Sequence, residues 1–319
     1  MKGEDAAMDN LVVTLNVVLP VFLVMVAGYL CKSLKIVADS TVNGMNKLVF
    51  QVFLPCSLAK SLMSVDRDMP MEYSVLLFCM AGVLATFLAG MLIVPRLVKE
   101  NPRRGVLIQG MFRSNYAIFG IPLAQALFPQ GDGGVAAMMV MATIPLFNVL
   151  AVITLEYFRG GKCSFGKVLL GIVKNPLIWG CLIGFAVMQL AIDLPQFAIL
   201  TVEKLAAIAS PLALFVLGAS IDLKKIGGNL RTLLWGTAAR LVFVPAVLLP
   251  IAYGLGFRGP EFAALMIAYA SPCAVSSYTM AAQMDGDSDL AAQMVMLTTV
   301  ASAFTIFLMV FLFKSLNIF

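Results

Sequence analysis

Two polar stretches inside apolar segments carry the residues that could bind a ligand. They are Arg113-Ser-Asn-Tyr-Ala-Ile-Phe-Gly-Ile-Pro122 and Ala270-Ser-Pro-Cys-Ala-Val-Ser-Ser-Tyr278. A proline has no backbone N–H and its ring crowds the preceding turn, so we expect Pro122, with Gly120, to break the first helix and Pro272 to break the second. Broken helices at corresponding positions of two halves are typical of the substrate site of a secondary transporter.

A broken membrane helix is tolerated where its freed backbone groups face protein or a watery cavity. The second half of such a helix presents N–H groups and the positive end of its dipole, which favour an anion. Tyr116 to Gly120 would frame one such end and Cys273 to Ser277 the other. We therefore predict that a carboxylate binds between the breaks, near Asn115 on one side and Ser271, Ser276 or Ser277 on the other. The alternative is a plain proline kink in each helix.

Two arginines lie deep in apolar segments. Arg240 is eleven residues beyond Asn229, roughly 16 Å along a helix, and Arg113 is nine beyond Arg104, roughly 13 Å. Intramembrane cations are costly and indicate functional sites by default, and both favour an anionic ligand. The alternatives are snorkelling toward the membrane surface and, for Arg240, a structural role that holds two helices together through carbonyls and a carboxylate.

Other polar residues of the apolar segments could line a cavity, although each could equally make a helix–helix hydrogen bond. They are Asn46, Gln51, Asn148, Ser210, Thr298 and Thr299, and we count Gln51 among the candidate binding residues. No carboxylate lies securely at mid-depth, which weakens a carboxylate-based coupling to H⁺ or Na⁺. Carbonyls and hydroxyls could still hold Na⁺, so the coupling ion stays open.

The sequence lacks the residues that several kinds of catalytic and metal sites require. The chain contains no histidine, and its six cysteines do not have metal-ligand spacing, so we expect free thiols and no metal. No G-x-S-x-G, H-E-x-x-H or P-loop motif is present. We predict no cofactor and no enzymatic activity.

The composition indicates a polytopic membrane protein. Of the 319 residues, 61% are hydrophobic and 12% charged, against roughly half and about a quarter in soluble domains. A spanning helix needs about 20 apolar residues, so the chain can hold about ten. The candidate spans are 11–31, 41–63, 73–95, 105–128, 135–157, 169–190, 197–221, 230–254, 261–284 and 290–313. The acidic residues before the first span argue against a cleaved signal.

The basic residues orient these spans, because lysine and arginine concentrate in cytoplasmic loops. With the N-terminus outside, thirteen fall on the inner side and six on the outer side. The inner set is Lys32, Lys35, Arg96, Lys99, Arg103, Arg104, Arg159, Lys162, Lys167, Lys174, Lys224, Lys225 and Arg231, and the outer set is Lys2, Lys60, Arg67, Lys204, Arg258 and Lys314. We predict both termini outside and the connector 158–168 inside.

The two halves of the chain resemble each other at an offset of 155 residues. Pro95 then matches Pro250, Gly131-Asp132 matches Gly286-Asp287, and the break near Asn115 falls on the second break. Five spans per half is an odd number, so the second half is inverted. We predict an all-α membrane fold with ten spans, repeats over 1–157 and 169–319, and spans four and nine broken.

Three motifs give the chain a family resemblance over nearly its whole length. It resembles the auxin efflux carrier family, and its bacterial members in particular, in Asn46-Lys-Leu-Val-Phe-Gln-Val-Phe-Leu-Pro-Cys56, in Arg113-Ser-Asn-Tyr116 with Gly120-Ile-Pro122, and in Ser210-Pro-Leu-Ala-Leu-Phe-Val-Leu-Gly218. The resemblance implies a ten-helix inverted fold in which helices four and nine cross where they unwind. It further implies a scaffold of helices one, two, six and seven and a moving bundle of helices three to five and eight to ten. It also implies small organic anions as substrates. The plant exporters have Asn-Pro at the first break, whereas here Tyr116 follows Asn115 and proline comes only at Pro122, so the resemblance by itself does not imply specificity for auxin.

Together these observations predict a secondary carrier of the inner membrane that moves a small organic anion, a dicarboxylate or an auxin-like acid, by alternating access. The rival functions are a non-transporting membrane receptor on the same fold and a channel. The expected partners are the anion and the lipid bilayer, with a homodimer left open and no nucleic acid.

Overall fold

The computed structural model describes residues 2–64, 72–128, 134–159, 165–222 and 226–319, and these residues form helices joined by short turns. Five helical segments in them are long and apolar enough to cross a membrane: Tyr73–Leu97, Met138–Phe158, Gln196–Ser220, Gly227–Gly254 and Ser288–Ser315. Many large apolar side chains on them are exposed, as expected for surfaces that face lipid. The predicted all-α polytopic fold is confirmed, while the count of ten spans stays a prediction.

The helices follow the order of the expected spans, with several spans divided into shorter pieces. They are α1 (Lys2–Ser33), α2 (Asp39–Leu48), η1 (Val49–Phe53), α3 (Leu54–Met63), α4 (Tyr73–Leu97), α5 (Asn101–Phe112), α6 (Tyr116–Leu127), α7 (Gly134–Phe158), α8 (Phe165–Lys174), α9 (Pro176–Gln189), α10 (Gln196–Ser220), α11 (Ile226–Ala238), η3 (Ala239–Phe243), α12 (Val244–Gly254), α13 (Gly259–Ala270), α14 (Ser276–Gln283) and α15 (Ser288–Ser315).

Two of the divided segments stay continuous through a π-helical turn. The turn η1 joins α2 to α3, and the turn η3 joins α11 to α12. Such turns are rare and are frequent at functional sites. The turn η3 contains Arg240, whose side chain is 1% exposed.

Helices α1 and α10 cross at very short range because each has a glycine at the contact. A methyl group at Gly28 of α1 would lie 2.0 Å from the carbonyl oxygen of Phe215, and one at Gly218 of α10 would lie 1.9 Å from the carbonyl oxygen of Met25. Small residues let membrane helices approach closely. A larger side chain at either position would force these two helices apart.

Helices α3 and α9 cross in the same way. Gly180 and Gly184 of α9 lie one turn apart, and a methyl group at either would come within 2.6 Å of a carbonyl oxygen of α3, that of Pro55 or Ala59. Helix α10 also contacts α3, so α1, α3, α9 and α10 form one closely packed set, called here the four-helix group. The division into two inverted repeats stays a prediction, and residues 160–164 of the predicted connector lie outside the described ranges.

We expect Gly184→Ala to lower the free energy of unfolding by about 1–3 kcal/mol, because the added methyl group overpacks a backbone contact. Its matched control is Gly227→Ala in α11, where a methyl group meets nothing within 4 Å. That control should be neutral or slightly stabilising, since alanine is the better helix former. Thermal unfolding in detergent compares the two, and equal melting temperatures would show that the α3–α9 crossing tolerates the change.

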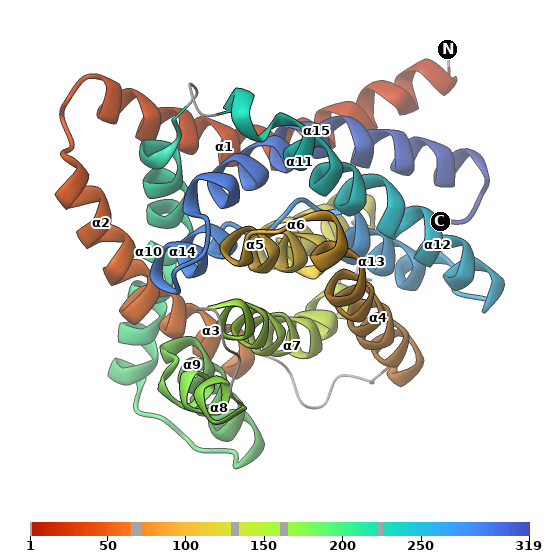
Figure 1. Cartoon of the computed structure of the whole chain (residues 1–319). Coiled ribbons are helices and arrows are strands. Elements are labelled where there is room, and N and C mark those ends of the chain that lie inside the picture. Colours follow the sequence, from red (N-terminus) through yellow and green to blue (C-terminus); the bar gives the residue numbers. More distant parts are fainter. Residues whose placement is uncertain (1, 65–71, 129–133, 160–164, 223–225) are drawn as a thin grey trace.

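The broken helices lie in the middle of the molecule. In Figure 1, α5 and α6 occupy the centre of the view, between α15 above and α7 below. Helix α13 contacts α6 and α7, while α14 contacts α5. The half-helices of both predicted breaks are thus surrounded by other helices and face little lipid.

Candidate functional site at the crossing of the broken helices

The first break lies at residues 113–115, between the end of α5 at Phe112 and the start of α6 at Tyr116. The prediction of a break beside Asn115 is confirmed, but its assigned cause was wrong. Helix α6 continues through Gly120 and Pro122 to Leu127, and Pro122 is exposed on it. The interruption is held by long-range contacts of the residues in the break, whereas the proline only costs the helix one hydrogen bond.

The second break lies at residues 271–275, where the sequence placed it. Helix α13 ends at Ala270, two residues before Pro272, because the residue that precedes a proline avoids the helical conformation. The two breaks pair as a short antiparallel bridge between Ser114 and Cys273. The Asn115 N–H donates to the Pro272 carbonyl at 2.9 Å, and the Ala274 N–H donates to the Arg113 carbonyl at 3.1 Å. Each break therefore satisfies backbone groups of the other.

Arg240 holds the ends of both N-terminal half-helices. Its guanidinium donates to the carbonyls of Met111 at 3.1 Å and Phe112 at 3.4 Å, at the end of α5, and to those of Ala268 at 3.0 Å and Ser271 at 2.9 Å, at the end of α13. The last carbonyls of a helix have no partner within it and carry its negative dipole end. Of the two roles predicted for Arg240, these contacts match the structural one, with carbonyls alone and no carboxylate among the described contacts.

Further hydrogen bonds fix the second break. The Cys273 N–H donates to Thr298 Oγ1 of α15 at 3.1 Å, and Gln109 Nε2 of α5 donates to the Ser277 carbonyl at 3.1 Å. Cys273 Sγ lies 3.6 Å from Ser277 Oγ. These contacts account for Thr298, Cys273 and Ser277 as residues that position the break.

A cavity of about 80 Å³ lies beside the crossing, where both breaks face helices of the four-helix group. We call it the central cavity. Its polar lining consists of Ser57 and Ser61 from α3, Arg113, Ser114 and Asn115 from the first break, Asn148 from α7, Ser210 from α10 and Ser276 from α14. On this measure one water needs about 10–15 Å³, so the cavity has room for several waters or a short-chain organic acid.

Arg113 is the charged group of this cavity. Its side chain is 3% exposed, and its guanidinium donates to Asn148 Oδ1 at 2.6 Å and contacts the Met280 sulfur. The side-chain amide of Asn148 donates to the Ile144 carbonyl at 2.8 Å, which orients Asn148 Oδ1 toward Arg113. Among the described residues Arg113 makes no ion pair. A buried guanidinium with an amide oxygen and a thioether as partners, facing a cavity, is poised to accept an anion.

Other donors converge on the same space. Ser114 Oγ and Asn115 Nδ2 are buried and have no hydrogen-bond partner within the part of the chain that the structure describes. Helices α6 and α14 both begin beside the cavity, at Tyr116 and Ser276, so the positive end of each helix dipole lies there. The site thus combines one cation, two positive helix ends and two unused donors.

The predicted binding residues fall into three groups. Arg113, Asn115 and Ser276 line the central cavity. Ser271, Pro272, Cys273 and Ser277 form or support the second break, Tyr116 is buried with its ring against Gly120, and Arg240 clamps the half-helices. Gln51 and Pro122 are exposed and outside the cavity lining.

The sequence analysis missed Ser57 and Ser61 as lining residues and included Ser114 only as a polar residue of the first break. The two serines of α3 are four residues apart and share one helix face, a spacing that could have drawn attention to them. Asn148 and Ser210, predicted only as polar residues that could line a cavity, do line it. Within the described residues no group of three or more histidine, cysteine, aspartate or glutamate side chains could hold a metal ion.

The family of this chain follows from its sequence profile. The profile described as Membrane transport protein matches residues 13–160 and 163–310, nearly the whole chain in two segments. The chain belongs to this family. It is the auxin efflux carrier family that the motifs indicated, so the resemblance to the family is confirmed, while the likeness to its bacterial members in particular stays a prediction. A protein of Methanothermobacter thermautotrophicus described as an uncharacterized transporter is 24% identical over 289 residues, which cover 89% of this chain and 93% of that protein.

Proposed function

We propose that this membrane transport protein is a secondary carrier that binds the carboxylate of a small organic anion at Arg113, in the central cavity. The observation that carries the proposal is the buried guanidinium with no ion pair among the described residues. Removing an ion from water costs several kcal/mol even after the protein relaxes. A carboxylate at Arg113 would offset this cost through charge-assisted hydrogen bonds.

The position of the cavity supports transport by alternating access. One wall comes from the four-helix group, through Ser57, Ser61 and Ser210, and the other from the crossing, through Arg113, Asn115 and Ser276. Polar binding residues between two bodies let the ligand face either side when one body moves against the other. The crossing carries all the charge of the site, so the anion would move with the crossing.

We also propose an inner-membrane location with both termini outside and the connector near residue 160 inside, on the thirteen-to-six distribution of basic residues. Single cysteines introduced into a background without native cysteines test this orientation. In intact cells, an impermeant thiol reagent should label a cysteine at position 193, between α9 and α10, and should spare one at position 159. Labelling in the opposite pattern would invert the topology.

The proposed function is tested by Asn115→Ala. Asn115 Nδ2 is a buried donor without a partner among the described residues, so the anion would lose a hydrogen bond. We expect transport and anion affinity to fall on the order of tenfold, which corresponds to about 1.4 kcal/mol. The control is Gln189→Ala at the exposed end of α9, which should change neither. A well-folded Asn115→Ala protein with normal transport would place the anion elsewhere.

A further inference from the structure

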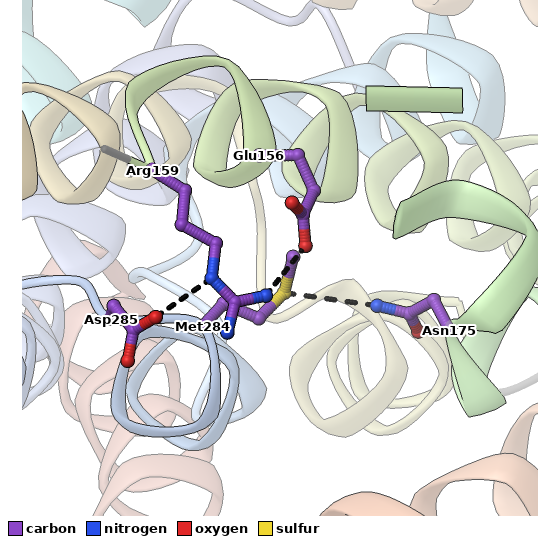
Figure 2. A network of polar contacts seen from close by, with 5 residues as sticks. All are labelled: Glu156, Arg159, Asn175, Met284 and Asp285. Atoms are coloured by element: carbon purple, nitrogen blue, oxygen red, sulfur yellow. Dashed lines mark hydrogen bonds and ion pairs between the residues drawn. The ribbon is translucent and has the colours of Figure 1, made fainter. Parts of the chain in front are cut away.

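A second cavity, of about 270 Å³, lies at the end of the molecule where α7 ends and α9 begins. We call it the connector-end pocket. Its lining includes Phe50, Glu156, Arg159, Lys174, Asn175 and Met284. Figure 2 shows Arg159 between the carboxylates of Glu156 and Asp285, at 3.0 Å and 2.7 Å, with Asn175 and Met284 beside them. The hydrogen bond to Asp285 raises the pKa of the Arg159 guanidinium, which therefore stays charged.

This pocket continues the central cavity along the same elements. On α7, Asn148 lines the central cavity and Glu156, eight residues on, lines the connector-end pocket. At α14 the corresponding residues are Ser276, its first residue, and Met284, which directly follows its last, again eight apart. Eight residues are about 12 Å of helix, and residues four apart share a face.

The other two walls also border both cavities, at a closer spacing. Leu54 of α3 lines the central cavity, and Phe50 of η1, four residues earlier, lines the pocket. On α9, Leu177 lines the central cavity while Asn175 lines the pocket. The same four segments therefore line both cavities, which are separated by eight residues on α7 and at α14, by four along η1 and α3 and by two at the start of α9.

Met280 occupies the separating turn on α14, halfway between Ser276 and Met284, and is fully buried. Its sulfur contacts Nη1 of Arg113, while the sulfur of Met284 accepts from Asn175 Nδ2 at 3.7 Å. A thioether is a weak acceptor, whereas a guanidinium binds a carboxylate strongly. The Met280 sulfur therefore occupies Nη1 of Arg113, a donor that would bind a carboxylate more strongly than it binds a thioether.

We propose that Met280 is the gate between the connector-end pocket and the central cavity, and that an anion arriving from this pocket displaces its sulfur from Arg113. The displacement of the Met280 sulfur from Arg113 by an anion rests on the proposed function. The role of Met280 as a barrier between the two cavities does not. A flexible, unbranched side chain suits such a role because it can leave one arrangement for another at low cost.

The charges of the described lining residues favour this route over the other opening on the same side. That opening, a cavity of about 530 Å³ between α1, α2, α10 and α15, has Lys32 with Asp39, Asp222 and Asp289 in its lining, a net charge of −2. The connector-end pocket has Arg159 and Lys174 with Glu156 in its lining, and Asp285, which pairs with Arg159, brings the net charge to 0. A negative field lowers the local concentration of an anion, so an organic anion would enter by the connector-end pocket rather than by the other opening.

The barrier is tested without any substrate. Ile144, which lines the central cavity, is replaced by cysteine in a background without native cysteines, and an anionic, impermeant thiol reagent is applied from either side of sealed vesicles. In the Met280→Ala variant, labelling from the connector side should be at least tenfold faster than in its parent. The control Met91→Ala, on α4 and outside both cavities, should match the parent. Equal rates for Met280→Ala and the parent, or faster labelling from the opposite side only, would overturn the gate.

The displacement is tested by equilibrium binding of a carboxylate panel to Met280→Leu, which keeps the volume and removes the sulfur. The anion then has no competitor at Arg113, and we expect its dissociation constant to fall about fivefold, or about 1 kcal/mol. An unchanged or weaker affinity would exclude displacement. If the wild-type protein binds none of the acids, the proposed function fails, and the labelling experiment still decides whether Met280 is a barrier.

Discussion

Arg113→Gln is expected to abolish high-affinity anion binding, with a loss on the order of 100-fold. A hydrogen bond between charged groups contributes about 1.5–3 kcal/mol, and about 2.8 kcal/mol corresponds to 100-fold in the dissociation constant. The folded protein should not suffer, because the substitution removes a buried charge that has no ion pair among the described residues. Anion binding and thermal unfolding of the same purified variant measure both effects.

The control for this substitution is Arg231→Gln, an exposed arginine of α11, which should leave affinity and melting temperature unchanged. If Arg113→Gln instead binds the anion normally, the guanidinium is not part of the site. If it fails to fold, Arg113 stabilises the crossing itself through Asn148, and its assignment to the ligand is wrong.

Arg240→Gln should have the opposite effect, with a large loss of stability and little loss of anion affinity. The guanidinium donates to four carbonyls at the ends of α5 and α13, and glutamine can replace at most two of these bonds. Each buried carbonyl that loses its partner costs about 1–3 kcal/mol. We expect the free energy of unfolding to fall on the order of 4 kcal/mol, a larger effect than most single substitutions produce.

The folded fraction of Arg240→Gln, separated by size-exclusion chromatography, should bind the anion with nearly wild-type affinity. Comparison with Arg113→Gln separates the two roles, because the same substitution is made at two buried arginines. A stable Arg240→Gln protein with strongly reduced affinity would reverse the two roles.

Much of the site could be predicted from residue types alone. Asn115, Arg113 and Ser276 were identified because a polar or charged group inside an apolar helix is costly, and the second break was located because the residue before Pro272 avoids the helical conformation. These signals are local, since the energetic cost of a buried polar group or of a proline arises in the residue itself or in its own helical turn.

The remainder depends on contacts between distant segments. The first break is held by Pro272, Ala274 and Arg240, which lie far from it in the sequence, so the nearby Pro122 was a misleading signal. The serines of α3 were missed because a serine costs little in a membrane helix, where its hydroxyl can donate to the preceding turn, as that of Ser61 does to the Ser57 carbonyl. Whether Arg240 meets carbonyls or a ligand could be decided only by the packing of α5, α13 and η3.

The most direct test of the account is a structure of the protein in complex with the acid that binds most tightly from a carboxylate panel. We expect the carboxylate in the central cavity, about 2.7–3.2 Å from the guanidinium of Arg113, between Asn115 and Ser276. The same acid bound at full occupancy outside this cavity, with Arg113 still on Asn148 and Met280, would contradict it.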